Sequence, residues 1–229
     1  ALELACRCLD RTESIASWQP GLSPHAPYSV HPELFRQVIS LSAERRVPLA
    51  FHLAESREEM EWLRTGGGPF QEFLQSLDAW DPTAMSPGTG LTDYLKMLVR
   101  AHRALVIHGN YLGDEEMALL AEHRDRMAVV YCPRTHAWFD HTAYPLERML
   151  ALGVNVAVGT DSRASSPDLS ILAELRAIAQ KHSAVEPATV LRLGTLDGAT
   201  ALGRGHEQGT LTPGKPADLA IVSLPDRED

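Results

Sequence analysis

The sequence predicts an α/β fold in which helices cover a parallel sheet. Short apolar runs end in turn residues, segments with helical periodicity follow them, and the two kinds of segment alternate along the chain. Strands that are joined through helices pair in parallel with right-handed crossovers. The chain has 229 residues, of which 44% are hydrophobic and 22% charged, so it can bury a sizeable core in one large domain or two small ones.

The expected strands are short runs that lack charged residues. The clearest runs from Val47 to His52, and its continuous apolar character is typical of a strand that is buried on both faces. The others are expected at Trp18 to Ser23, Ala104 to Ile107, Met127 to Tyr131 and Val154 to Val158.

The expected helices fill the intervals between these runs and were placed by apolar spacing, with prolines and acidic residues in several first turns. They are Ala1 to Ile15, His31 to Arg46, Ser56 to Arg64, Phe70 to Leu77, Leu91 to His102, Asp114 to His123, Tyr144 to Leu152, Pro167 to Gln180 and Pro187 to Leu202. The tail is different, because turn residues from Gly209 lead to an expected strand at Leu219 to Val222 that belongs to a small second sheet.

The charge and composition exclude several classes of partner. The net charge is −9 and no basic stripe is present, which argues against a nucleic-acid or anionic-membrane surface. No apolar run approaches the roughly 20 residues that span a bilayer. Three cysteines cannot build a disulfide framework, so we expect a cytoplasmic protein. The expected partner is a small-molecule substrate, and formation of a homodimer is a further alternative.

Chemically active side chains recur where the expected strands end. His25, His52, His108 and Asp161 stand within a residue or two of four of the five strand ends. A core histidine with both nitrogens bonded, or an aspartate that caps a turn, is the ordinary interpretation of any one of them. Their recurrence favours a shared site, because catalytic groups of a βα barrel gather at the C-terminal ends of its strands.

These residue types suit a divalent metal. Imidazole and carboxylate are ligands of Zn²⁺ and Fe²⁺, and a catalytic zinc keeps one position open for water, whose pKa it lowers towards about 7. Glu55 lies three residues after His52, where it can lean over the metal and carry protons. We therefore expect one divalent ion, Zn or Fe.

Five motifs carry a resemblance to a known family. They are SPHAPYSV around His25, HLAES from His52, IHGN around His108, CPRTH from Cys132 and VNVAVGTDS up to Asp161. Together they resemble the amidohydrolase superfamily, and within it the deaminases of cytosine, guanine, S-adenosylhomocysteine, methylthioadenosine and aminofutalosine. The resemblance implies a (β/α)8 barrel of the TIM type, with strands four to eight present here, and a small appended β-sandwich. It divides the chain into residues 1–205, from the barrel, and 206–229, from the sandwich.

The same resemblance implies a role for each candidate residue. His52 and Asp161 correspond to metal ligands, and Asp161 also acts as the initial base. Glu55 resembles the acid that moves a proton to the substrate ring nitrogen, and His108 the histidine that orients the attacking water. The substrate-contacting residues implied by the resemblance are His25, Arg134 and His136.

One departure from the family pattern is serious. The family supplies two further ligands from an HxH motif on its first strand, and no two histidines here stand two apart. Five barrel strands alone would leave unpaired edges, which proteins avoid. We therefore expect that the native protein is longer or that another chain supplies the missing part.

The expected activity is metal-dependent hydrolytic deamination of an amino-substituted heterocycle, such as a purine nucleoside derivative. Two alternatives stay open. The same site could cleave a C–N amide or a C–Cl bond, or the chain could be a metal-free barrel remnant that acts as a binding or scaffold protein. The zinc signature of nucleic-acid deaminases, HxE with PCxxC, is missing.

Overall fold

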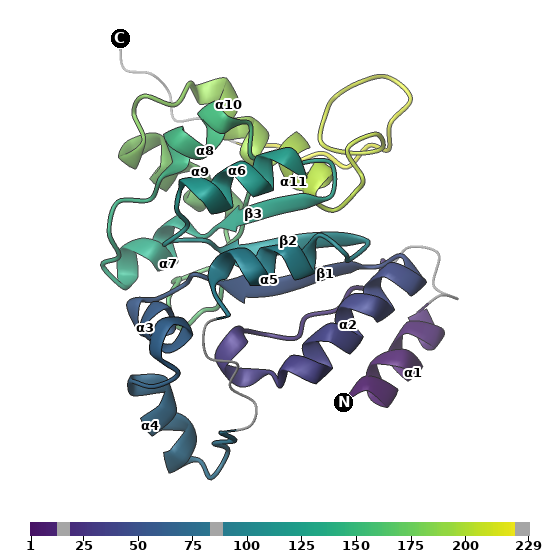
Figure 1. Ribbon diagram of the computed structural model, residues 1–229. Coiled ribbons are helices and arrows are strands. Elements are labelled where there is room, and N and C mark those ends of the chain that lie inside the picture. Colours follow the sequence, from purple (N-terminus) through teal and green to yellow (C-terminus); the bar gives the residue numbers. More distant parts are fainter. Residues whose placement is uncertain (13–18, 83–88, 223–229) are drawn as a thin grey trace.

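A computed structural model describes residues 1–12, 19–82 and 89–222. Its centre is one parallel sheet with the strand order β1-β2-β3-β4, so the order in the sheet follows the order in the sequence. The strands are β1 (Pro48–Leu53), β2 (Arg103–His108), β3 (Met127–Tyr131) and β4 (Val156–Val158). Figure 1 shows how helices surround this sheet. The α/β prediction is confirmed, and the described strands form an arc of the barrel type.

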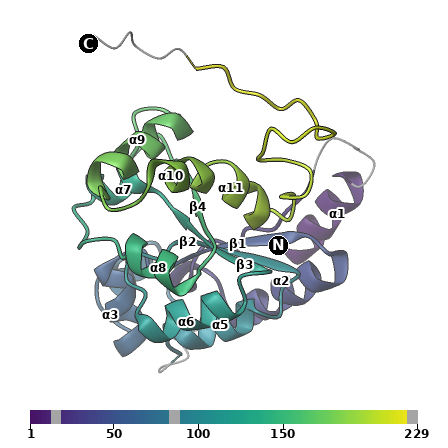
Figure 2. The same cartoon turned by 90° about the horizontal axis from the view of Figure 1, so that it is seen from above.

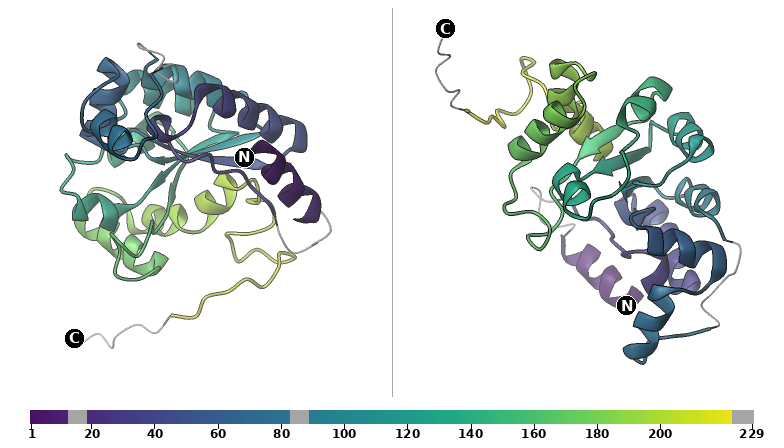
Figure 3. Two further views of the ribbon diagram at one scale, coloured as in Figure 1. Left: turned by 90° about the horizontal axis from the view of Figure 1, so that it is seen from below. Right: turned by 90° about the vertical axis from the view of Figure 1, so that its left-hand side faces the viewer.

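Most of the helices lie where the apolar spacing predicted them. They are α1 (Leu2–Thr12), η1 (Pro27–Ser29), α2 (Pro32–Arg45), α3 (Arg57–Thr65), α4 (Pro69–Ser76), α5 (Leu91–Leu98), α6 (Asp114–Glu122), α7 (Pro133–Trp138), α8 (Leu146–Leu152), α9 (Ile171–Lys181), α10 (Pro187–Leu193) and α11 (Leu196–Ala201). In the left view of Figure 3, α1 lies beside α2. Among the described helices, none is long and apolar enough to cross a membrane.

Alternate strand residues point to opposite faces of the sheet, and one face carries the main core. On β1, Leu49, Phe51 and Leu53 are fully buried under the outer helices. Phe51 stacks on Phe35 of α2 at 4.4 Å between ring centroids, and both rings contact Tyr94 of α5. Figure 2 shows α2, α5, α6 and α8 together on this side of the strands. The apolar core therefore holds the strands in place, and the carboxyl ends of the strands can carry functional side chains.

The opposite face is covered near the bottom of the strands by α11. Ala201 of this helix packs on Ala128 and Ala157, with Leu105 and Val130 around them. Arg103, at the start of β2, donates from Nη1 to the carbonyl of Thr200 at 3.1 Å. Helix α11 therefore lies at the amino ends of the strands, away from the carboxyl ends that carry the candidate residues.

The strand predicted at Trp18 to Ser23 is reduced to a single bridge. Trp18 lies outside the described residues, and only Leu22 pairs with β1, opposite Leu49. The peptide N–H of His52 donates to the carbonyl of His25 at 2.7 Å, so the segment still runs along the edge of β1. Prolines at 20, 24 and 27 explain the difference, since proline has no N–H for a ladder.

Two other predictions differ from the structure. The strand expected at Leu219 to Val222 is wrong, because residues 216–222 have no regular structure and Ile221 is 99% exposed. No partner strand for them occurs in the described parts of the chain, which contain one sheet. Figure 2 shows this segment leading away from the helices. In addition, helix α7, which begins at Pro133, lies in the interval after β3, where no helix was expected.

Candidate active site

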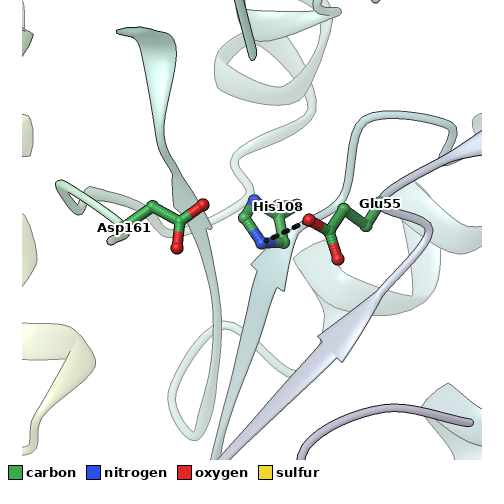
Figure 4. Close-up of side chains that lie close together, drawn as sticks. All are labelled: Glu55, His108 and Asp161. Atoms are coloured by element: carbon green, nitrogen blue, oxygen red, sulfur yellow. Dashed lines mark ion pairs between the residues drawn. The ribbon is translucent and has the colours of Figure 1, made fainter. Parts of the chain in front are cut away.

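Three of the predicted residues converge at the carboxyl ends of the strands. His108 is the last residue of β2, Glu55 follows β1, and Asp161 follows β4. One ligand atom from each lies within 4.8 Å of the others, and Figure 4 shows the three side chains pointing toward one another. Oε1 of Glu55 is 3.4 Å from Nε2 of His108. His108 is 53 positions after Glu55 in the sequence (108 − 55), and Asp161 is 106 positions after it (161 − 55). The fold therefore brings distant parts of the chain to one point.

Two further histidines extend this cluster in a row. The ring centroid of His52 lies 5.3 Å from that of His108 and 5.2 Å from that of His25. His52 is not a member of the group of three, but Nδ1 of His52 is 3.1 Å from the carbonyl oxygen of His25. A metal-binding histidine characteristically donates its other ring N–H to such a carbonyl, which leaves Nε2 for the ion.

The backbone is strained at the residues that present the site. His25, His108 and Asp161 have φ values of 77°, 71° and 58°, and Ala54, directly before Glu55, has 57°. Left-handed backbone is uncommon outside glycine, and such residues cluster at functional sites because the surrounding structure must hold them. The chain thus turns sharply after β1, β2 and β4, where Glu55, His108 and Asp161 are presented to the site.

Burial sets the protonation of the cluster. Desolvation and the charge of Asp161 raise the pKa of Glu55 to about 7. Desolvation and neighbouring His52 lower the pKa of His108 to about 4. At neutral pH the imidazole of His108 is therefore uncharged, while Glu55 is poised between its acid and its base.

Asp161 is held by its own loop. Its Oδ1 accepts from the N–H of Ser162 at 2.7 Å, and Oγ of Ser165 lies 3.5 Å from Oδ2. Ser165 is in turn 2.9 Å from Oγ1 of Thr135, at the start of α7. These contacts orient the carboxylate without a cation.

The donor set fits a divalent metal. The cluster offers imidazole nitrogens and carboxylate oxygens within 4.8 Å of one another, which is the ligand chemistry of Zn²⁺ and Fe²⁺. His52 and Asp161 remain the predicted ligands, with His108 and Glu55 between them. The carboxylates alone would repel each other, so a cation between them would relieve that repulsion.

The structure does not bring Arg134 and His136 into this group. Nε of Arg134 donates to the fully buried carboxylate of Glu174 at 2.6 Å, and Nη2 donates to Asp168 at 2.6 Å. His136 is 2% exposed, and its two ring nitrogens lie 2.9 Å from the carbonyl of Thr142 and 3.1 Å from Nζ of Lys181. Both side chains are engaged in helix packing, so their substrate contact remains a prediction only.

A cavity of about 370 Å³ opens beside Glu55, and its walls include residues that the sequence reasoning missed. Tyr111 and His141 face it, and the hydroxyl of Tyr111 is 3.0 Å from Nδ1 of His141. Tyr111 stands three residues after His108, and this position just after a strand end could have predicted it. His141 could not be placed in the same way, because it follows helix α7, which was not predicted. The lining residues are Glu55, Ser56, Arg57, Glu58, Tyr111, Phe139, Asp140 and His141.

The family assignment follows from comparison with known proteins. The model of the amidohydrolase family matches residues 7–228, which is nearly the whole chain. The chain belongs to the amidohydrolase family. The resemblance seen in its motifs is confirmed, and its parallel sheet is that of the family's TIM-type barrels.

Relatives of this amidohydrolase chain are named as deaminases. A 5-methylthioadenosine/S-adenosylhomocysteine deaminase of Moorella thermoacetica is 36% identical over 210 residues, 89% of this chain and 44% of that protein. The aminofutalosine deaminase of Helicobacter pylori, solved with methylthio-coformycin, gives a TM-score of 0.78 at 28% identity, covering 95% of this chain and 54% of the other. An adenosine deaminase of Xanthomonas campestris with bound zinc gives 0.73 at 28%, covering 95% and 46%. The chain spans about half the length of the curated relatives it matches.

Proposed function

We propose that this amidohydrolase chain takes part in the metal-dependent hydrolytic deamination of an amino-substituted heterocycle, a purine nucleoside derivative. The observation that carries the proposal is the convergence of Glu55, His108 and Asp161 within 4.8 Å at the ends of three strands. The named activities of the relatives, on methylthioadenosine, S-adenosylhomocysteine and adenosine, support the purine nucleoside class.

His52 and Asp161 would hold the ion, Zn or Fe, with the remaining ligands outside the described residues. When bound, the metal supplies a water of lowered pKa. The zinc-containing relative supports zinc as the first choice. The three cysteines continue to favour the cytoplasm. We also propose that residues 1–205 belong to the barrel and that residues 206–229 are the segment that leads to the appended sandwich.

The proton transfers fall to three side chains. Asp161 takes the first proton from the attacking water, and neutral His108 holds that water by a hydrogen bond. Glu55, with its pKa raised to about 7, can give a proton to the ring nitrogen next to the reacting carbon. Water adds at the carbon that bears the amine, and the amine leaves as ammonia when Asp161 passes the first proton to it. The new hydroxyl then becomes a carbonyl and returns its remaining proton to Glu55. His25 would contact the heterocycle, and its place beside His52, at 5.2 Å between ring centroids, supports this role.

Ammonia release from the full zinc-loaded chain tests this function. Glu55→Gln should lower the rate at least about 100-fold, because general acid–base catalysis contributes about 10²- to 10⁴-fold. The matched control is Glu61→Gln, an exposed carboxyl on the same helix that does not line the cavity, which should change the rate by less than about threefold.

The screen should include adenosine derivatives, guanine, cytosine and aminofutalosine, with chloride and carboxylate release measured beside ammonia. Near-normal ammonia release by Glu55→Gln would contradict the assigned role. Release of chloride or carboxylate without ammonia would favour the other hydrolytic reactions, and a metal-free, inactive full chain would favour a scaffold.

A further inference from the structure

Glu59 is a buried acid to which the proposed reaction gives no role. It lies in the first turn of α3, and its side chain is fully buried. Its two oxygens accept from two successive peptide N–H groups: Oε1 from Ala54 at 2.9 Å and Oε2 from Glu55 at 2.7 Å. Burying a carboxylate costs free energy unless hydrogen bonds compensate for it. A buried acid whose hydrogen bonds go to two loop amides therefore needs an explanation.

Ordinary helix capping does not account for this contact. In a capping box the N-cap serine accepts from the N–H three residues later, and the acid at that position reaches back to the N-cap N–H. Ser56 does accept from the N–H of Glu59 at 3.1 Å. The Glu59 carboxylate, however, extends beyond the N-cap to the two residues before it, where Ala54 has a φ of 57°. It therefore holds the left-handed turn between β1 and α3.

A second side chain holds the same residue from its other end. Nδ2 of Asn110, which is 6% exposed, donates to the carbonyl oxygen of Glu55 at 2.8 Å. Asn110 stands two residues after His108, so this bond connects the ends of β1 and β2. The N–H and the C=O of Glu55 are thus both fixed by side chains, one from α3 and one from the loop after β2.

We propose that Glu59 and Asn110 are positioning residues that hold the backbone of Glu55, so that its carboxyl faces His108 and Asp161. The side chain of Glu55 has several rotatable bonds and is 26% exposed, so packing alone leaves it freedom. A fixed backbone restricts where its carboxyl can lie. A displacement of about 1 Å in a catalytic group can cost about 10²-fold in rate.

The inference rests on the proposed function, but its first test does not need a substrate. Amide hydrogen exchange of Ala54 and Glu55 is measured in the full zinc-loaded chain. Glu59→Gln should raise both exchange rates at least about tenfold, since opening free energy scales at about 1.4 kcal/mol per factor of ten. Glu61→Gln, an exposed acid on the same helix, should leave them unchanged. Unchanged exchange in Glu59→Gln would overturn the proposal whatever the enzyme's substrate is.

The second test asks whether the position of Glu55 is what matters. In ammonia release, Glu59→Gln and, separately, Asn110→Ala should lower kcat about 10- to 100-fold, while KM and zinc affinity stay within about threefold. In a Glu55→Gln background the same substitutions should cost less than about twofold, because the group they position is already inactive.

The outcomes separate the two proposals. An equal loss of kcat in both backgrounds would show general damage and overturn the positioning role, as would raised exchange with normal kcat. Asn110→Ala, which removes a single neutral hydrogen bond, covers the case in which Glu59→Gln does not fold. If wild type releases no ammonia from any candidate, the proposed function fails, and the exchange measurement still decides whether Glu59 holds the turn.

Discussion

Individual residues at the strand ends adopt backbone conformations that the sequence does not reveal. The motifs were enough to select His25, His108 and Asp161, since histidine and aspartate after a buried run are visible in a sequence. Their positive φ values were not visible, because tertiary contacts impose them. The roles of Glu59 and Asn110 also escaped prediction: an acid in a first turn is ordinarily a solvated cap.

Asp161 offers a direct test of the metal site. Asp161→Asn removes one anionic ligand and should weaken zinc binding by at least about 10-fold, in line with losses known for altered metal surroundings. Equilibrium dialysis against a zinc buffer measures the change. Asp125→Asn, in which a 68% exposed carboxyl is altered, is the control and should bind zinc as wild type does. Equal zinc affinities of the two variants would contradict Asp161 as a ligand.

We predict that the free energy of unfolding depends on pH through His136. Burial and the neighbouring Lys181 lower its pKa from 6.5 to about 4. In the unfolded chain, His136 therefore binds a proton near pH 6.5. In the folded chain it stays neutral until the pH falls to about 4. The stability that this histidine contributes is complete above pH 6.5 and is lost as the pH falls from 6.5 towards 4, by about 3 kcal/mol at most.

Urea unfolding at several pH values between these limits checks the effect. His136→Gln cannot titrate, so its free energy of unfolding should fall less steeply with acid than that of wild type. Parallel curves for the two proteins would mean that the pKa of His136 is the same in the folded and the unfolded chain.

At the scale of elements, buried apolar runs were the most reliable signal. Strand β3 agrees with its prediction at both ends, and β1 and β2 agree within one residue, because these apolar runs have no exposed residue. Helix α7 was missed because it has six residues and begins within a Cys-Pro pair that resembles a turn. The predicted helix from Pro187 to Leu202 is two helices, which separate at Gly194 and Thr195.

The ion pair between α7 and α9 makes a prediction of its own. Arg134→Met leaves the fully buried carboxylate of Glu174 without its cation and should cost about 3 kcal/mol or more of unfolding free energy. Arg148→Met is the matched control: its pair with Asp114 is 55% and 73% exposed, so its loss should cost less than about 1 kcal/mol. Urea denaturation compares the two. Equal losses would show that the Arg134 pair contributes no more than a surface contact.

Across the whole molecule, the proposed ligands stand on the first and last strands of the sheet. His52 belongs to β1 and Asp161 follows β4, so a bound ion would connect the two ends of the arc. The sequence predicted that side chains after these strands would meet, because parallel strands end on one side, and Glu55, His108 and Asp161 do meet. That His52 and Asp161 share an ion stays a prediction.

Zinc should therefore stabilise the fold. At a free concentration of about 100 times Kd, a ligand that binds only the folded state adds about 2.7 kcal/mol. Removing zinc with a chelator should lower Tm, and readdition should restore it, in a scanning calorimeter. Asp161→Asn should show a much smaller change. If neither the chelator nor zinc changes Tm, this cluster does not bind the ion.

The separation of the two faces has a practical consequence. Helices α5, α6 and α8 lie on the far side of the sheet from α11 and contribute none of the converging side chains. A dye, a surface tether or a fusion partner attached to the exposed side of α6, for example at Glu115, would leave the mouth of the cavity clear. That helix is therefore a suitable site for immobilising or labelling the protein.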